Sequence, residues 1–200
     1  MYAMHGLFTS VQIWGEEMNN LFERVSESSS ANKDTHTHRA YKKAYSWVMD
    51  KLVLAGNFDP FSLDLFARMC PWADIRVDIN PEFKQKGYTN KCDDALDYAK
   101  TQENGLFDII LCDPPFSDRQ AKDKYGTSNL YTNPAYISEL GKECFRILEP
   151  GGYLVKCGYN SNAPEPNLVL VKGYISHYYG CRNDVIVTIW QKQDGILQVL

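Results

Sequence analysis

The sequence lacks the features that mark several common classes of protein. No two of its six cysteines lie close enough for a CxxC motif, so neither a zinc ribbon nor a dithiol redox site is expected. No apolar run approaches the roughly 18 residues of a membrane span, and no basic stretch followed by an apolar core marks a secretory signal. We therefore expect a cytoplasmic protein with no membrane partner and no metal.

An excess of positive charge is also absent. The chain carries 21 Lys and Arg residues against 25 Asp and Glu residues, which gives a net charge of −4. This balance argues against a generally basic nucleic-acid binder, although it allows a local positive groove. The 200 residues, 44% of them hydrophobic, suit a single globular domain over 1–200. Within it we expect an N-terminal helical segment at 1–57, with a mobile loop at 26–38, and an α/β core at 58–192.

Two stretches of the N-terminal segment have apolar residues at helical spacing. They predict helices at 15–25 and 40–54. The polar stretch between them has no apolar anchor, which predicts a loop, and its His36 and His38 are expected to be solvated.

Glycine is missing at the position where a nucleotide-binding sheet most often has it. The pattern predicts a first strand at Phe61–Ala67 and a second at Ile75–Ile79. The turn Ala67–Trp72 between them contains no glycine to bring backbone against a ligand. The connection is also too short for a usual crossover, so its helix should be a single turn or missing. Asp78 in the second strand is suited to binding a ribose diol.

The most informative stretch that is present runs from Leu106 to Phe116. Phe107–Leu111 has the composition of a strand buried on both faces. The tetrad Asp113-Pro114-Pro115-Phe116 follows, and its prolines end the sheet ladder and hold the chain extended. A carboxylate and an aromatic ring should therefore lie at the carboxyl end of a central strand, where open α/β sheets bind ligands.

The groups of this tetrad suit one kind of chemistry. The Asp113 carboxylate and the Pro114 carbonyl are two acceptors that could bind an exocyclic NH2 and draw its lone pair out of conjugation. Phe116 offers a flat face on which a base can stack. The tetrad thus predicts a site that makes an aromatic amine nucleophilic, whereas the simpler reading is a strand that ends in a proline turn.

The remaining pattern completes an α/β fold. It predicts strands at 88–92 and 153–157 and helices at 95–101 and 135–148. Residues 168–190 predict a helix followed by two strands, joined by a turn containing Gly180 and forming a hairpin at the sheet edge. The polar segment 117–134 is long for a connection, so we expect a lid over the base pocket that also contacts the nucleic-acid strand.

These motifs together resemble class I S-adenosylmethionine-dependent methyltransferases of the DPPY/F type, which act on exocyclic amino groups of nucleic acids. The similarity extends over about residues 58–192, and the chain resembles small phage-type DNA adenine-N6 methyltransferases without a separate target-recognition domain. It rests on Asp64-Leu-Phe-Ala-Arg68, Val77-Asp-Ile-Asn-Pro-Glu82, Asp113-Pro-Pro-Phe-Ser117, Gly158-Tyr-Asn-Ser-Asn162 and Asn183-Asp184.

The resemblance implies a fold, a cofactor and a set of site residues. The fold is a Rossmann-like, mostly parallel sheet with an antiparallel C-terminal strand, helices on both faces and a shortened first crossover. The cofactor is S-adenosylmethionine, and DNA is the transient substrate. The residues implied to be catalytic are Asp113, Pro114, Pro115 and Phe116; those implied to bind the cofactor are Asp64, Phe66, Ala67, Arg68, Asp78, Ile79, Asp93, Asp94, Ala95 and Asp113; those implied to bind the substrate are Phe116, Arg119, Lys122, Tyr125, Tyr159 and Asn160.

Two alternatives stay open at the level of the sequence. The same chemistry could act on RNA, on guanine N2 or on a protein amide. The glycine-free turn and the acidic net charge would also fit a catalytically inactive methyltransferase-like module that binds nucleic acid or a protein.

Overall fold

A computed structural model of the chain describes residues 21–27, 39–115, 119, 121–122, 132–178 and 184–193. Their centre is an eight-stranded mixed sheet in the order β1-β7-β8-β6-β5-β2-β3-β4. Its strands are β1 (Phe22–Glu27), β2 (Ser62–Asp64), β3 (Ile75–Asp78), β4 (Lys91–Cys92), β5 (Phe107–Cys112), β6 (Leu148–Gly158), β7 (Leu168–Tyr178) and β8 (Val185–Lys192). The helices are α2 (Arg39–Leu54), α3 (Pro81–Gln85), α4 (Ala95–Lys100) and α6 (Pro134–Ile147).

The strand order contains one reversal, between β2 and β5. The chain runs outward from β2 to β3 and β4, returns to the other side of β2 as β5, and continues to β6. All of these strands are parallel to their neighbours, whereas β8 is antiparallel to both β6 and β7. A reversal of this kind is a topological switch point, which opens a crevice at the carboxyl ends of the two strands.

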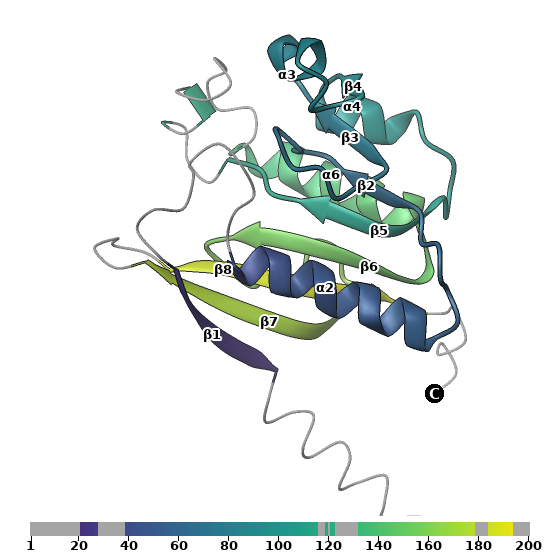
Figure 1. Ribbon diagram of the computed structural model, residues 1–200, viewed down its shortest axis with the longest axis vertical. Helices are drawn as coiled ribbons and strands as arrows, with labels where there is room; N and C mark the ends of the chain where they lie inside the picture. The colour runs from purple at the N-terminus through teal and green to yellow at the C-terminus, as the bar shows by residue number, and fades with distance from the viewer. Residues whose placement is uncertain are drawn as a thin grey trace, which may run out of the picture.

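Helices cover both faces of the sheet, as expected. Figure 1 shows α2 in front of the sheet and α6 behind it. In β5, Ile109 and Leu111 pack into the core on the α2 side, while Ile110 and Cys112 pack into the core beneath α4 and α6. The predicted strand buried on both faces is therefore confirmed, and so is the α/β Rossmann-like fold class with its antiparallel C-terminal strand.

The first crossover has no helix among its residues 65–74, which all lie in the described part of the chain. Its first residues instead lengthen the sheet, because Leu65 N–H donates to the carbonyl of Leu111 (3.1 Å) and Ala67 N–H donates to that of Val77 (2.9 Å). The expectation that this crossover is shortened is confirmed.

The helix predicted at 15–25 is wrong in its second half, because residues 22–27 form β1; residues 15–20 lie outside the described part of the chain. β1 pairs in parallel with β7, and only Val25 of its apolar residues is buried, facing α2. Phe22 lies where Gly173 leaves space, since a Cβ at Gly173 would be 2.3 Å from the Phe22 ring. Tertiary pairing therefore overrides the helical spacing. Residues 26–27 of the loop predicted at 26–38 belong to β1, and residues 28–38 lie outside the described part of the chain.

The helix expected ahead of the C-terminal strands is also wrong, because residues 168–178 form the strand β7. β-Branched residues recur along this segment, and hydrogen-bonded neighbours lie on both sides of it, β1 and β8. The β7–β8 hairpin is present but not at the sheet edge, which β1 occupies; Gly180 lies outside the described residues.

Helix α3 was not predicted, although the sequence carries a signal for it. Asn80 is the N-cap, whose side chain accepts a hydrogen bond from Glu82 N–H (2.9 Å), and Pro81 is the first helical residue. Asn133 and Pro134 start α6 in the same way. An Asn-Pro pair thus starts a helix at both places.

In the described part of the chain, no helix is both long enough and apolar enough to cross a membrane.

Gly141 lets helix α6 approach the segment that follows β6. A Cβ at this position would lie 2.3 Å from the carbonyl oxygen of Pro164. Replacing Gly141 by Ala should therefore destabilise the protein by about 1–3 kcal/mol, despite the better helix propensity of alanine. Urea unfolding measures the change, with Lys142→Ala on the exposed face as the control. An unchanged or higher free energy of unfolding for Gly141→Ala would contradict the close contact.

Candidate active site

Two predicted site residues meet at the switch point of the sheet. Asp64 is the last residue of β2 and pairs with Leu111, and Asp113 directly follows β5. Leu111 faces α2, so the residue two positions further along is placed on the same side. The charges of both carboxylates raise the pKa of Tyr41 in α2, after the larger effect of its burial. Asp64 and Asp113 therefore lie near each other under the start of α2.

Asp64 begins the turn that the sequence makes without glycine. Its side chain is fully buried, and Oδ1 accepts a hydrogen bond from the backbone N–H of Phe66 (3.1 Å). This contact bends the chain directly after β2. Phe66 and Ala67, both predicted to bind the cofactor, are buried in the bend.

Arg68 adopts the backbone conformation that a glycine would otherwise provide. Its φ is +47°, the left-handed region, and among the described residues no other non-glycine has a positive φ. The Arg68 N–H donates to Oδ2 of Asp78 (3.1 Å). The other oxygen of that carboxylate accepts the N–H of Asn80 (2.8 Å). Asp78 thus stabilises a strained turn at the crevice.

Burial of Asp78 has an electrostatic consequence. The carboxylate is 2% exposed, and desolvation raises its pKa, opposed by the hydrogen bonds from Asn80 and Arg68 and by the charge of Arg68. The guanidinium of Arg68 lies 5.9 Å from the ring centroid of Phe83 in α3. Ile79, the next predicted cofactor residue, is half-buried.

Aromatic residues of α2 cover the crossover in place of its missing helix. Tyr41 and Tyr45 stack on Trp72 with centroid distances of 6.1 and 5.4 Å. The Tyr45 hydroxyl donates to the Trp72 carbonyl oxygen (3.1 Å). Cys70 is buried beside them, and burial raises its pKa to about 12. From the sequence alone, these tyrosines beside basic residues could equally grip a phosphate backbone or belong to a solvated helix face. Neither interpretation holds for Tyr41, which is fully buried, because only contacts distant in sequence reveal its packing.

Asp93 and Asp94, the two acidic residues after β4, have different roles. Asp94 is the N-cap of α4 and accepts hydrogen bonds from Leu96 and Asp97 N–H. The hydroxyl of Tyr136 in α6 also reaches both oxygens of Asp94 (3.1 Å each). Asp93 is exposed, and its Oδ1 accepts the N–H of Asp94 (2.9 Å). Asp94 is therefore fixed in place, with Ala95 buried behind it.

The tetrad is described up to its second proline. Pro114 and Pro115 are buried, which fits a rigid exit from β5. Phe116 and Tyr125, predicted to bind the substrate, lie outside the described residues, as does most of the predicted lid. Within the lid, Arg119 and Lys122 are exposed while Ala121 is fully buried in the core beneath α4 and α6.

The segment after β6 lies beside the tetrad. Lys156 of β6 pairs with Cys112, and its Nζ donates to the carbonyl of Asn162 (3.2 Å). Burial lowers the pKa of Lys156. Tyr159 and Asn160, both exposed, follow the end of this strand. The structure therefore places these two predicted residues at the same sheet edge as Asp113.

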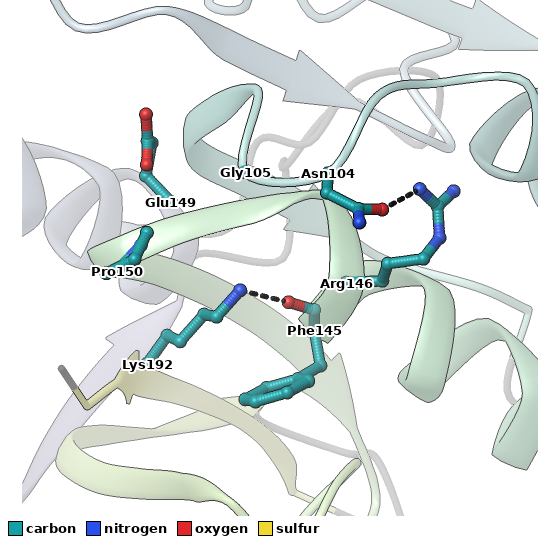
Figure 2. Close-up of a pocket in the computed structure, with 7 residues that line it drawn as sticks. All are labelled: Asn104, Gly105, Phe145, Arg146, Glu149, Pro150 and Lys192. Carbon is teal, nitrogen blue, oxygen red and sulfur yellow. Dashed lines mark hydrogen bonds between the residues drawn. The ribbon is translucent and has the colours of Figure 1, made fainter. Parts of the chain in front are cut away.

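A hollow of about 540 Å³ lies at the amino-terminal end of β5 and not at this crevice. Figure 2 shows two cations on its walls, each bound to the protein itself. Lys192 Nζ donates to the carbonyls of Phe145 (2.9 Å) and Leu148 (2.6 Å), and Arg146 binds Asn104 Oδ1 (2.7 Å). These groups cap α6 and hold the α4–β5 connection, so we assign the hollow no part in the candidate site.

The described residues contain no group of three or more His, Cys, Asp and Glu side chains that could hold a metal ion.

The strained turn generates a prediction. Both Arg68→Gly and Arg68→Ala remove the contacts of the arginine side chain. Glycine adopts the left-handed backbone conformation without steric strain, whereas alanine keeps the strain that arginine has there. We expect the glycine variant to be more stable than the alanine variant by about 1 kcal/mol, measured by urea unfolding. Equal stabilities would show that the turn carries no strain.

Comparisons with known proteins bear on the fold. No family model matches the sequence, and no curated protein matches it. The structure is similar to that of the N-methyltransferase NodS from Bradyrhizobium japonicum in complex with S-adenosyl-L-homocysteine, with a TM-score of 0.50 and 13% identity over 90% of this chain and 98% of NodS. TrmN from Thermus thermophilus gives a TM-score of 0.47 and 15% identity over 78% of this chain and 53% of TrmN. At this identity, the likeness to NodS shows that the chain has an α/β Rossmann-like fold of the kind found in methyltransferases.

Proposed function

We propose that the protein is an S-adenosylmethionine-dependent methyltransferase that acts on an exocyclic amino group of a nucleic-acid base, with adenine N6 in DNA as the foremost substrate. One observation carries the proposal: Asp113, followed by two buried prolines, lies beside Asp64 at the switch point of a methyltransferase-like sheet. A carboxylate fixed at this position suits the binding of an amine next to a bound cofactor.

The residues at the crevice have the charge that the cofactor requires, and they lie on neighbouring strands. S-Adenosylmethionine carries a sulfonium and an ammonium group, and the carboxylates of Asp64, Asp78 and Asp113 lie at the carboxyl ends of three adjacent strands, β2, β3 and β5. When bound, it supplies an electrophilic methyl group and leaves as a neutral thioether. Asp78 would hold the ribose, and Asp94 with Ala95 would hold the adenine.

The turn at Arg68 removes the main objection to a cofactor site. A glycine-free turn would fit an inactive module if the chain could not bend there. The left-handed Arg68, held by the Asp78 carboxylate, makes the bend with a different residue. The proposed enzyme is therefore favoured over the inactive module.

The tetrad would prepare the acceptor amine. One N–H of the amine would donate to the Asp113 carboxylate and the other to the Pro114 carbonyl, so that the nitrogen lone pair points at the methyl group. Asp113 would also accept the proton that the nitrogen gives up after methylation. The fixed φ of each proline restricts the backbone around the Pro114 carbonyl.

A base is the acceptor that suits the surroundings of this site. The two exposed cations Arg119 and Lys122 follow the tetrad, and Tyr159 is 48% exposed at the neighbouring strand end. Cations that bind phosphate and aromatic rings that stack on bases are the usual elements of such a surface. An adenine would have to be flipped out of a duplex or presented in a single strand to reach the pocket.

Cofactor binding can be tested through the turn. Asp78→Asn keeps the size of the side chain, but its NH2 group cannot accept the Arg68 N–H. We expect this variant to bind S-adenosylmethionine at least about tenfold more weakly by isothermal titration calorimetry, because one charged hydrogen bond and the ribose contact are lost. Glu82→Gln, an exposed carboxylate in α3, is the matched control and should bind as the wild type does. Equal affinity of Asp78→Asn would place the cofactor elsewhere.

Methyl transfer can be tested through the tetrad. Asp113→Asn should reduce transfer by about 100-fold or more while leaving the melting temperature near that of the wild type. The assay offers adenine-containing single-stranded DNA, duplex DNA and RNA, and identifies the methylated nucleoside by mass spectrometry. Asp50→Asn, on the exposed face of α2, is the control. Transfer by the wild type to a protein amide alone would contradict the proposed substrate, and an unaffected Asp113→Asn would contradict the proposed site.

A further inference from the structure

The chain leaves strand β6 through a segment without helix or strand, residues 159–164, which we name the exit segment. The exit segment starts at the edge of the sheet that carries the candidate site, and its first residue, Tyr159, is 48% exposed. The next four side chains are exposed as well. Exposed side chains contribute little to fixing a backbone, so the course of this segment must depend on hydrogen bonds and on close backbone packing.

Two contacts hold the exit segment from within and at its far end. Asn160 Oδ1 accepts a hydrogen bond from the backbone N–H of Asn162 (3.2 Å), which forms an Asx turn. The carbonyl oxygen of Pro164 lies so close to Gly141 of α6 that a Cβ there would be 2.3 Å from it. These contacts fix the local shape and the end of the segment, but they do not tie the part that carries Tyr159 to the sheet.

A third contact joins the exit segment to the sheet. The Nζ of Lys156 in β6 donates a hydrogen bond to the carbonyl oxygen of Asn162 (3.2 Å). This bond closes a loop of the chain from residue 156 to residue 162, and Tyr159 is its middle residue. The position of Tyr159 therefore depends on a side chain that starts inside the sheet.

The base of the Lys156 side chain is fixed by the strands on both sides. Lys156 pairs with Cys112 of β5 and with Thr188 of β8. Its carbonyl oxygen accepts a hydrogen bond from the Thr188 hydroxyl (3.2 Å), and the indole N–H of Trp190 donates to the oxygen of that hydroxyl (2.9 Å). Cys112 directly precedes the tetrad. Lys156 thus connects a rigid point beside the tetrad with the exposed exit segment.

Lys192 shows what a lysine with a structural role does in this fold. It is half-buried like Lys156, and its Nζ also donates to backbone carbonyl oxygens, those of Phe145 and Leu148. These acceptors lie at the junction of α6 and β6, at the opposite edge of the sheet. The acceptor of Lys156 lies instead in an exposed segment beside the candidate site. The loss of this bond should therefore move the exit segment and leave the core intact.

We propose that Lys156 is a positioning residue, which holds the exit segment so that the Tyr159 ring forms one wall of the pocket for the acceptor base. The inference rests on the proposed methyl transfer to a base and deepens it, because it assigns the residue that fixes the substrate side of the site. In this role Lys156 acts through Tyr159. Its removal should weaken the use of nucleic acid and spare the cofactor, since the carboxylates that would hold the cofactor lie at the ends of other strands, β2, β3 and β5.

Lys156→Met tests this role, because methionine keeps a long apolar stem and removes the ammonium group. We expect KM for adenine-containing single-stranded DNA to rise about fivefold, since part of the stacking contribution of Tyr159 is lost. Neither kcat nor the affinity for S-adenosylmethionine, measured by isothermal titration calorimetry, should change. Lys192→Met is the matched control, which should lower stability and keep the wild-type KM. An unchanged KM in Lys156→Met, or an equal rise in Lys192→Met, would contradict the positioning role.

A double-mutant cycle tests whether Lys156 acts through Tyr159. Tyr159→Ala should raise KM for the same DNA about tenfold, because the ring is lost altogether. Adding Lys156→Met to Tyr159→Ala should raise KM no further, since no ring is left to position. Multiplied effects in the double variant would overturn the inference, because Lys156 would then contact the nucleic acid on its own, as a phosphate-binding cation does. An unchanged KM in Tyr159→Ala would overturn it as well.

A measurement on the free protein does not depend on activity. Backbone order parameters from NMR relaxation should fall at residues 160–162 in Lys156→Met, toward the values below about 0.6 that mark a flexible backbone, but not in Lys192→Met. Unchanged order parameters would overturn the inference even in an active enzyme. If they fall while the wild type transfers no methyl group to any nucleic acid, Lys156 still holds the exit segment and the proposed function fails.

Discussion

The paired hydrogen bonds that the Asp78 carboxylate accepts from Arg68 and Asn80 are the constraint on which the site depends. A turn after the first parallel strand must bring backbone close to the crevice, and glycine usually makes that possible because it lacks a Cβ. Here a carboxylate at the end of β3 secures an arginine in the same left-handed conformation. This arrangement lowers the stability of the fold locally, because Arg68 has a strained backbone conformation and the Asp78 carboxyl group is buried.

Helix α2 supplies the cover that the short crossover cannot. Tyr41 and Tyr45 stack on Trp72, so a helix that precedes β2 in the sequence fills the layer normally occupied by the first crossover helix. The same helix brings Tyr41 into one core cluster with Leu111 and Cys157, at the carboxyl ends of β5 and β6. The short connection thus leaves α2 packed against the edge of the sheet that carries the candidate site.

Local patterns allowed much of this fold and site to be predicted. β5 reads as buried on both faces because its residues are apolar without alternation, and the Asp-Pro-Pro run marks its end. The errors concern pairing: β1 has apolar residues at helical spacing, and β7 is a strand because β1 and β8 flank it. The packing of Tyr41 and Tyr45 on Trp72 gave no local signal, since tyrosines beside basic residues look like a surface until contacts distant in sequence are known.

The strand order also governs how the chain can fold. β8 lies between β6 and β7, so among the described strands the outer pair of β7 and β1 joins the rest of the sheet only through β8. Until β8 is inserted, β6 and β7 present open edges that other strands could pair with. During synthesis, the crevice half of the sheet can therefore assemble first, and the edges of β6 and β7 stay open until β8 has emerged.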